Sequence, residues 1–280
     1  MQVFVTEKAL KNRISFLKKK GLSIGFVPTM GALHAGHMQL IKASKRKCDI
    51  TVCSVFVNPT QFNNKEDLIK YPRTIEKDKQ MLKENDVDIV FFPTKEVIYP
   101  EGMDLNVDID LEGLDELWEG EFRPGHFKGV VQVVKRLLDL VSPEYLFMGQ
   151  KDFQQFTIVN MMLKKMQIDT ELVVVPIHRE KSGLAMSSRN VRLTVEYRRK
   201  ALVLSRMLKY VKNNYSFENI NSLEDYVLKQ IKKEGLRPEY FKIVEGKYLK
   251  EVSSVNEDSV IAIVAAWAGK IRLIDNIIIK

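Results

Sequence analysis

The chain has 280 residues, of which 45% are hydrophobic, and this composition is typical of a folded globular protein and excludes a disordered one. No apolar run reaches the ~18 residues of a membrane span, and the first residues lack the basic-then-apolar layout of a secretion signal. The formal charge of +8 would suit a nucleic-acid-binding protein, but the lysines and arginines lie in short, separate clusters without interleaved aromatic residues. We therefore expect a cytoplasmic protein that binds neither membranes nor nucleic acids, whose basic clusters are solvated or attract anionic substrates.

The two cysteines, Cys48 and Cys53, lie beside and within an apolar run at residues 49–57. A metal site would need further ligands nearby, and the surrounding sequence offers none. We expect both cysteines to fill apolar space in a reducing compartment, with no metal bound by the protein.

Hydrophobic periodicity alternates between helix and strand along the first 177 residues. Amphipathic helices are expected at residues 6–20, from Gly36 onward, and at 74–85, 127–141 and 152–166, and buried strands at 22–27, 49–57, 88–92, 145–148 and 171–175. A long polar loop is expected between the second and third of these strands. The alternation predicts an α/β fold with a Rossmann-like, doubly wound parallel sheet.

The pattern changes beyond Arg189. Charged amphipathic helices at residues 194–212 and 222–233 precede short alternating strands near 240–244, 260–266 and 271–274. They predict a smaller α+β C-terminal domain, so we expect domains at residues 1–177 and 178–280. The loop at 178–189 contains Gly183, and we expect the second domain to hinge there as a lid.

The stretch at residues 22–42 is the most informative part of the chain. An apolar strand stops at Pro28, a turn with two glycines follows, and a helix begins near Gly36. His34 and His37 lie three residues apart at the start of this helix, where backbone N–H groups and the helix dipole favour an anion such as phosphate. The alternative is that both histidines only cap and pack the helix.

Four polar segments each follow directly on a predicted strand, at residues 28–37, 58–61, 149–155 and 178–189. The carboxyl ends of parallel strands meet at one edge of a sheet, and ligands bind there in open α/β folds. Three of the four histidines lie in these segments, which favours a functional role for the pair at the helix start.

Lys151 and Asp152 begin a helix after a strand, so the lysine suits a phosphate and the carboxylate suits a ribose hydroxyl or Mg²⁺. The alternative is an exposed ion pair at a helix start. Ser187, Ser188 and Arg189 supply two hydroxyls and a cation in a loop of the kind that closes over a polyphosphate. The sequence contains neither a P-loop nor a dinucleotide-binding glycine motif.

Six segments, at residues 28–37, 57–62, 71–74, 123–127, 149–155 and 186–190, resemble the motifs of the pantothenate synthetase (pantoate–β-alanine ligase) family in the same order. The resemblance extends to residues 272–276. The His-x-Gly-His element at 34–37 also resembles that of the wider nucleotidylyltransferase superfamily, which includes class I aminoacyl-tRNA synthetases.

The resemblance implies a two-step reaction. ATP and (R)-pantoate would give pantoyl adenylate and pyrophosphate, and β-alanine would then attack the adenylate to give pantothenate and AMP. Mg²⁺ would accompany ATP, and the family resemblance also implies a homodimer formed through the N-terminal domain.

The resemblance also implies the roles of individual residues. His37 is the family's proton donor, and we expect it to act in catalysis with His34, Lys151 and Arg189. Gln61 and Gln155 would bind pantoate, and Gln61 would also bind β-alanine. The ATP site would comprise Met30, Gly31, Ala32, Leu33, His34, Ala35, Gly36, His37, Gly149, Gln150, Lys151, Asp152, His178, Met186, Ser187, Ser188 and Arg189.

Two positions depart from the family pattern. The family has Gly-Glu-Lys-Asp where this chain has Gln150, so a carboxylate at that position is missing. Position 178 is apolar in the family and is His178 here, but the implied contact is made by the backbone.

Two rival functions are compatible with parts of this pattern. One is an RNA-binding module that kept the fold and lost ATP chemistry, which needs a focused basic surface. The other is a nucleotidylyltransferase that acts on a phosphorylated substrate instead of pantoate.

Overall fold

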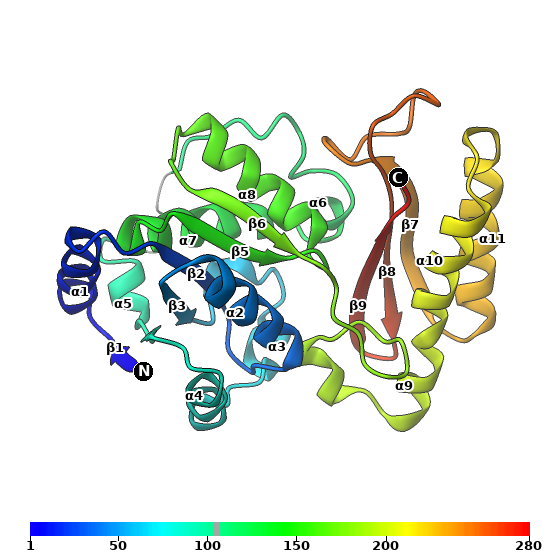
Figure 1. The fold of residues 1–280 in the computed structure, drawn as a ribbon. Helices are drawn as coiled ribbons and strands as arrows, with labels where there is room; N and C mark the ends of the chain where they lie inside the picture. Colours follow the sequence, from blue (N-terminus) through cyan, green and yellow to red (C-terminus); the bar gives the residue numbers. More distant parts are fainter. Residues whose placement is uncertain (103–106) are drawn as a thin grey trace. The chain divides into compact units, whose positions relative to one another are not determined.

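The structure is a computed structural model, and it describes residues 1–102 and 107–280. The chain divides into two compact units (Figure 1). Unit 1 comprises Met1–Gln150 and Ile158–Pro176, and unit 2 comprises Lys151–Thr157 and Ile177–Lys280. The boundary after Pro176 lies next to the one expected from the sequence, whereas the short segment Lys151–Thr157, expected in the first domain, belongs to unit 2.

Unit 1 is built on a six-stranded sheet in the order β1-β4-β3-β2-β5-β6, in which all neighbouring strands are parallel. From β2 the sheet extends through β3 and β4 on one side and through β5 and β6 on the other. This arrangement confirms the Rossmann-like, doubly wound sheet. The strands are β1 (Gln2–Phe4), β2 (Ile24–Thr29), β3 (Ile50–Val55), β4 (Ile89–Phe91), β5 (Tyr145–Gly149) and β6 (Glu171–Val175).

The direction of the winding changes between β2 and β5, which is where open α/β sheets bind their ligands. The ladder between these two strands ends with Gly25 opposite Tyr145 and Phe26 opposite Leu146. The last residues of β2 therefore pair with β3 alone, and the loop after β2 starts at the switch point of the sheet.

Helices connect the strands, and the longer ones bury apolar side chains. The described helices that begin in unit 1 are α1 (Glu7–Lys19), α2 (Ala35–Lys47), α3 (Lys65–Lys70), α4 (Ile75–Glu84), α5 (Lys95–Ile98), α6 (Glu119–Phe122) and α7 (His126–Val141), with a 3-10 turn η1 (Pro59–Gln61). Helix α8 (Phe153–Lys165) begins in unit 2 and continues into unit 1.

Helix α2 lies very close to β2 because the strand has a glycine where they meet. A Cβ atom at Gly25 would lie 2.3 Å from Ser44 Oγ and 2.8 Å from Cys48 Sγ, both on or next to α2. The Ser44 hydroxyl shares a hydrogen bond of 2.8 Å with Thr51 on β3, so its burial leaves no unpaired hydroxyl. This contact fixes the helix whose first turn carries the histidine pair.

Helix α3 lies where a polar loop was expected. Its six residues include no buried side chain, so the hydrophobic pattern of a packed helix is missing. It starts because the Asn64 side chain caps it, accepting hydrogen bonds from the backbone N–H groups of Glu66 at 2.8 Å and Asp67 at 3.3 Å.

Unit 2 contains a three-stranded antiparallel sheet in the order β7-β8-β9, with α10 and α11 packed on one of its faces (Figure 1). This confirms the smaller α+β part, although the single helix expected at 194–212 is two helices that meet at Ala201. The elements are η2 (Ser188–Arg192), α9 (Val195–Lys200), α10 (Leu202–Asn214), η3 (Phe217–Asn219), α11 (Ile220–Lys233), β7 (Arg237–Glu245), β8 (Val260–Ala268) and β9 (Ile271–Ile278). Among the helices of residues 1–102 and 107–280, none is both long and apolar enough to cross a membrane.

Candidate active site

The loop that follows β2 carries the histidine pair. Gly31 and Ala32 have φ values of +77° and +47°, so two consecutive residues lie in the left-handed region. A Cβ atom at Gly31 would lie 3.0 Å from both Asp78 Oδ2 and a carbon of Val55, so a larger residue would displace the loop. The tight turn brings the chain from β2 to the start of α2.

Asp78 of α4 holds this loop in place, and the residue is only 2% exposed. Its Oδ2 accepts a hydrogen bond from the Ala32 N–H at 3.0 Å, and its Oδ1 accepts one from the Leu33 N–H at 2.8 Å. The Thr74 hydroxyl also donates to Oδ1, at 3.1 Å. An ionised carboxylate accepts at both oxygens, and such charge-assisted bonds are stronger than neutral ones. The buried carboxylate therefore fixes two consecutive amides just before His34.

His34 and His37 both cap α2 through Nδ1. The Gly36 N–H donates to His34 Nδ1 at 3.1 Å, and the His34 N–H donates to His37 Nδ1 at 3.2 Å. A ring nitrogen that accepts a hydrogen bond carries no proton, so each neutral ring carries its proton on Nε2. Capping and ligand binding are thus compatible, because capping uses Nδ1 and sets Nε2–H as the donor.

The two rings lie together, with centroids 4.0 Å apart and planes inclined by 34°. His34 is the N-cap of α2 and His37 lies in its first turn, where the helix dipole is positive. The arrangement presents two N–H donors from one helix end, which suits the oxygens of a phosphate.

The segment after β3 presents Gln61 and is fixed by Asn58, which is 1% exposed. The Asn58 side-chain amide donates to the Gly129 carbonyl at 3.0 Å, and its oxygen accepts from the Tyr99 hydroxyl at 2.6 Å. A Cβ atom at Gly129 would lie 2.4 Å from the Thr60 carbonyl oxygen, so the glycine allows α7 and this segment to touch. The backbone around Gln61 is therefore well anchored in unit 1.

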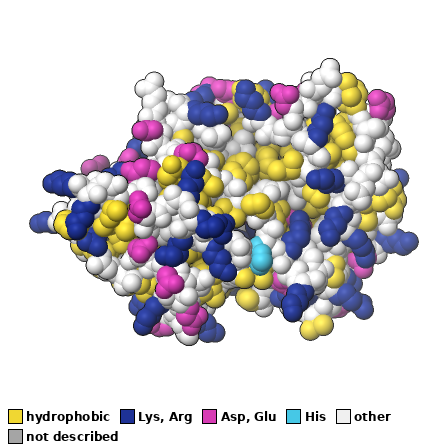
Figure 2. All heavy atoms as spheres, viewed as in Figure 1, with side chains coloured by type: hydrophobic (Ala, Val, Ile, Leu, Met, Phe, Trp, Pro, Cys, Tyr) yellow, Lys and Arg dark blue, Asp and Glu magenta, His cyan; other side chains and the backbone are white. Residues whose placement is uncertain are grey.

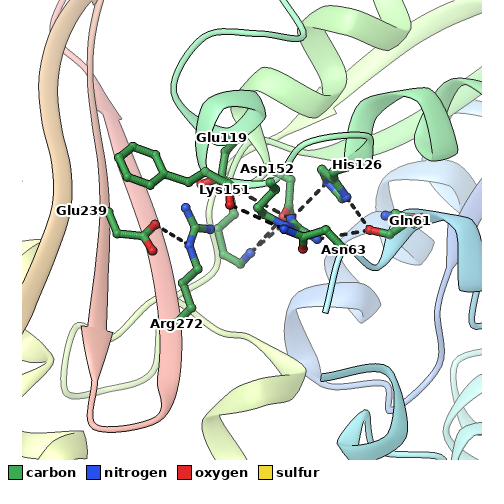
Figure 3. A network of polar contacts seen from close by, with 10 residues as sticks. Gln61, Asn63, Glu119, His126, Lys151, Asp152, Glu239 and Arg272 are labelled. Carbon is green, nitrogen blue, oxygen red and sulfur yellow. Dashed lines mark hydrogen bonds and ion pairs between the residues drawn. The ribbon is translucent and has the colours of Figure 1, made fainter. Parts of the chain in front are cut away.

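His126 and Arg123 hold the carbonyl oxygen of Gln61. Figure 3 shows the His126 side chain pointing toward Gln61. His126 Nδ1 lies 2.7 Å from that oxygen, and Arg123 Nη2 donates to it at 3.4 Å. A carbonyl only accepts, so Nδ1 carries the proton, and Nε2 accepts from Arg123 Nη1 at 3.0 Å. Glu119 forms an ion pair with Arg123 at 3.5 Å. The sequence left the role of His126 open, and the structure places it behind Gln61 as a neutral support.

Lys151 and Asp152 lie in unit 2, at the start of α8. The ammonium Nζ of Lys151 lies 3.2 Å from each carboxylate oxygen of Asp152, so the ion pair expected as the alternative is present. The Lys151 side chain is 18% exposed and that of Asp152 is 46% exposed, which leaves the carboxylate open to an incoming group. Gln155 follows on α8 and is half-buried.

The segment at 178–189 is a folded hairpin within unit 2. Arg179 bridges Ala185 across it, and the Met186 N–H donates to the His178 carbonyl at 3.1 Å. Gly183 forms its turn with a φ of +98°. The hinge expected at this glycine stays a prediction, while its local role is to reverse the chain.

Ser187 starts the turn η2 as its N-cap, accepting a hydrogen bond from the Arg189 N–H at 3.3 Å. Asn190 is 4% exposed, and its side-chain amide donates to the Ala185 carbonyl at 3.0 Å and to Glu180 at 3.2 Å. The two hydroxyls and the guanidinium expected to bind phosphate are thus carried by an internally bonded turn.

Comparison with known proteins decides the family. The model of the pantoate-beta-alanine ligase family matches residues 2–278. The chain is 44% identical to the pantothenate synthetase of Bacteroides fragilis over 282 residues, covering 99% of this chain and 98% of that protein. The chain belongs to the pantoate-beta-alanine ligase family. Membership makes it an enzyme, a ligase of pantoate and β-alanine.

Two solved structures are also similar to this ligase. The pantothenate synthetase from Thermus thermophilus superimposes with a TM-score of 0.86 at 38% identity, covering 100% of this chain and 99% of that one. The pantoate-beta-alanine ligase from Francisella tularensis was solved as a complex with beta-gamma ATP and beta-alanine. It superimposes with a TM-score of 0.84 at 36% identity, covering 100% of this chain and 98% of that one.

At the two departures from the ligase pattern, the backbone makes bonds that do not depend on the side chain. The Gln150 N–H donates to the Val175 carbonyl at 2.8 Å, so the backbone at this position extends the pairing of β5 with β6 whatever the side chain is. His178 uses its carbonyl for the hairpin, which any residue could supply.

Sequence reasoning assigned no supporting role to Asp78, Asn58 or Gly129 in this ligase. Each supports a candidate ligand-binding segment through bonds or contacts to distant parts of the chain. The only local signal for Asp78 is that it lies four residues after Thr74, which ends the family motif at 71–74. Asn58 lies inside the family motif at 57–62.

Proposed function

We propose that the chain joins (R)-pantoate to β-alanine at the expense of ATP, with pantoyl adenylate as the intermediate and pantothenate, AMP and pyrophosphate as products. The observation that carries this proposal is the pair of Nε2–H donors that capping fixes at the start of α2, in a chain that belongs to the ligase family along its whole length. Beta-gamma ATP and beta-alanine accompany the Francisella tularensis structure, which supports ATP and β-alanine as substrates.

In the first step a carboxylate oxygen of pantoate attacks the α-phosphorus of ATP, and the bond to pyrophosphate breaks. Negative charge grows on the phosphoryl oxygens and the leaving group, so fixed hydrogen-bond donors lower the barrier. His34 and His37 would donate through Nε2–H, with His37 as the proton donor. Lys151 and Arg189 would add positive charge at the phosphates, and the hydroxyls of Ser187 and Ser188 would donate further hydrogen bonds.

Gln61 and Gln155 would hold pantoate. Neutral amides orient a carboxylate without neutralising it, so the attacking oxygen stays nucleophilic. The anchoring of the Gln61 backbone by His126 and Arg123 supports this role, because a positioning group must itself be held in place.

In the second step the β-alanine amine attacks the carbonyl carbon of the adenylate. The bond from that carbon to the bridging oxygen breaks, AMP leaves, and the amine loses a proton as the amide forms. Gln61 would also contact β-alanine. The mixed anhydride reacts with water, so the enzyme must exclude water until β-alanine arrives. The C-terminal unit would serve as the lid, as expected from the sequence.

Mg²⁺ would enter with ATP and not as a resident ion. Within residues 1–102 and 107–280, no three His, Cys, Asp or Glu side chains are grouped to hold a metal. Mg²⁺ fits such a chain because it takes most of its ligands from phosphates and water, with one or two carboxylates from the protein. Asp152, exposed at the start of α8, is the carboxylate we propose. When bound, Mg²⁺ would neutralise charge on the triphosphate.

The remaining partners and the compartment are also proposals. The free thiols Cys48 and Cys53 support the reducing cytoplasm. On the face drawn in Figure 2, lysines and arginines lie in small groups among acidic and apolar side chains, and the proposal includes no nucleic-acid partner. Exposed apolar residues of unit 1 such as Val3 and Phe16, 46% and 47% exposed, supply surface for a homodimer. Light scattering that gives the mass of one chain would reject the dimer.

An exchange assay tests the proposed function. Labelled pyrophosphate should enter ATP when enzyme, Mg²⁺ and pantoate are present and β-alanine is left out, and no exchange should occur without pantoate. Exchange that depends on a phosphomonoester instead would favour the other nucleotidylyltransferase function. No exchange by folded protein, together with tight RNA binding, would favour the RNA-binding module.

A further inference from the structure

The strand β9 carries two consecutive polar residues, Asp275 and Asn276, that the proposed reaction does not use. They are 4% and 2% exposed, in a strand whose other residues are mostly apolar. Consecutive residues of a strand point to opposite faces, so two buried polar side chains in a row need partners on both sides of the sheet.

Asp275 binds Arg179 at the base of the hairpin. The two guanidinium nitrogens of Arg179 donate to the two carboxylate oxygens at 2.6 and 2.8 Å, and the Asp275 side chain is 3% exposed. Arg179 also donates to the carbonyls of Gly183 at 3.2 Å and Asn276 at 3.4 Å. A two-point pair of this kind fixes orientation as well as distance. The hairpin that leads into Ser187 is thereby tied to β9.

Asn276 ties the second segment to the same point. Its side-chain amide donates to the Lys151 carbonyl at 2.9 Å, and its own N–H donates to Asp275 Oδ1 at 2.8 Å. Because β9 is the outer strand of its sheet, these bonds also satisfy backbone groups on an edge that β8 does not cover. One dipeptide thus contacts both the Lys151 segment and the hairpin.

We propose that Asp275 and Asn276 are positioning residues that hold the two ATP-binding segments of unit 2, Lys151 with Asp152 and Ser187 through Arg189, in one arrangement. The inference rests on the proposed function for the identity of the ligand. It assigns a role to the final motif, at residues 272–276, in a part of the chain remote in sequence from both segments. Neither residue touches substrate in this role.

The test is Asn276→Ala, which removes the donor to Lys151 and leaves the ion pair of Asp275 in place. Asn256→Ala, at an exposed position in the loop before β8, is the matched control. A misplacement of about 1 Å in a phosphate-binding group lowers its contribution roughly 10-fold to 10²-fold. We expect the KM for ATP in the exchange assay to rise about 10-fold, the KM for pantoate to change less than about 2-fold, and the control to match the wild type.

Arg179→Lys provides the second variant, since lysine keeps the charge and loses the two-point geometry. It should also raise the KM for ATP, and the double variant should lose less than the product of the two single effects, because both act on one arrangement. Arg206→Lys, in an exposed pair with Glu234 at 2.9 Å, is its control.

A structural readout separates positioning from general stability. Amide hydrogen exchange should increase at residues 150–152 and 177–190 in Asn276→Ala, while exchange in β7 and α11 stays as in the wild type. The midpoint of unfolding should fall only by the amount expected for one lost buried hydrogen bond. Equal rises in both KM values with faster amide exchange in β7 and α11 as well, or an unchanged KM for ATP, would overturn the inference. If the wild type itself shows no pantoate-dependent exchange, the proposed function fails, and direct ATP binding by equilibrium dialysis still tests the positioning role.

Discussion

Asp78→Asn is the sharpest perturbation of the histidine loop. The substitution keeps the size of the side chain and replaces one carboxylate oxygen by an amide NH₂. The remaining oxygen can keep the bonds from Leu33 and Thr74, which both use Oδ1. The new NH₂ group then faces the Ala32 N–H, which in the wild type donates to Oδ2 at 3.0 Å, so a donor meets a donor.

The magnitude follows from these contacts. A hydrogen bond to a charged acceptor contributes about 1.5–3 kcal/mol, and a buried donor left without an acceptor costs about 1–3 kcal/mol. The loop thus loses roughly 3 kcal/mol of its preference for the observed arrangement. Because each 1.4 kcal/mol is about a factor of ten, we expect pantoate-dependent pyrophosphate exchange to fall about 10²-fold.

The assay compares Asp78→Asn with Glu76→Gln, the same chemical change at an exposed position of α4, where Glu76 pairs with Lys79. Exchange rates should separate the two variants, and amide hydrogen exchange at Ala32 and Leu33 should rise in the first alone. If Asp78→Asn exchanges pyrophosphate as fast as Glu76→Gln, or loses activity only in proportion to the fraction unfolded, the carboxylate does not position the loop.

Three further results are expected. His37→Ala should slow pyrophosphate exchange about 10²-fold to 10³-fold and lower the unfolding midpoint only by the small amount expected for one lost helix cap, and a loss of cooperative unfolding would instead assign the ring to packing. His126→Leu should raise the KM for pantoate about 10-fold, whereas His126→Asn should raise it less because the asparagine amide can still donate to the Gln61 carbonyl. If either variant raised the KM for ATP as much as the KM for pantoate, His126 would not act through Gln61. Burial raises the pKa of Cys48 to about 11 and that of Cys53 to about 12. At pH 8 iodoacetamide should therefore alkylate Cys48 about 10²-fold more slowly in the native than in the denatured enzyme, and the native rate should rise toward pH 11. Fast alkylation of the native enzyme at pH 8 would refute this prediction.

The sheet and the histidine pair could be predicted from the sequence because their signals are local. Apolar runs of strand length alternate with helical periodicity, and His34 and His37 follow a strand and a turn within a dozen residues. The residues that hold the site in place could not be predicted, because their hydrogen bonds join segments that lie far apart in the chain. Asp78 lies 46 residues from Ala32, and a carboxylate on an amphipathic helix is expected to face solvent until the loop that buries it is known.

The end of β9 shows the same limit. The strand was expected near residues 271–274, yet it continues through Asp275 and Asn276 to Ile278. The two polar residues remain in the strand because Arg179 and the Lys151 carbonyl satisfy them. Hydrophobic patterning finds strands that bury apolar side chains, and it misses those whose buried residues bind other segments.

The path of one oxygen atom tests the central claim most directly. Pantoate labelled with ¹⁸O in its carboxylate is converted with ATP, Mg²⁺ and β-alanine, and the products are analysed by mass spectrometry. If the carboxylate attacks the α-phosphorus, one ¹⁸O atom leaves in AMP, the other stays in the amide carbonyl of pantothenate, and pyrophosphate carries none. Label in inorganic phosphate with ADP as the nucleotide product would show attack at the γ-phosphorus and would contradict an acyl adenylate.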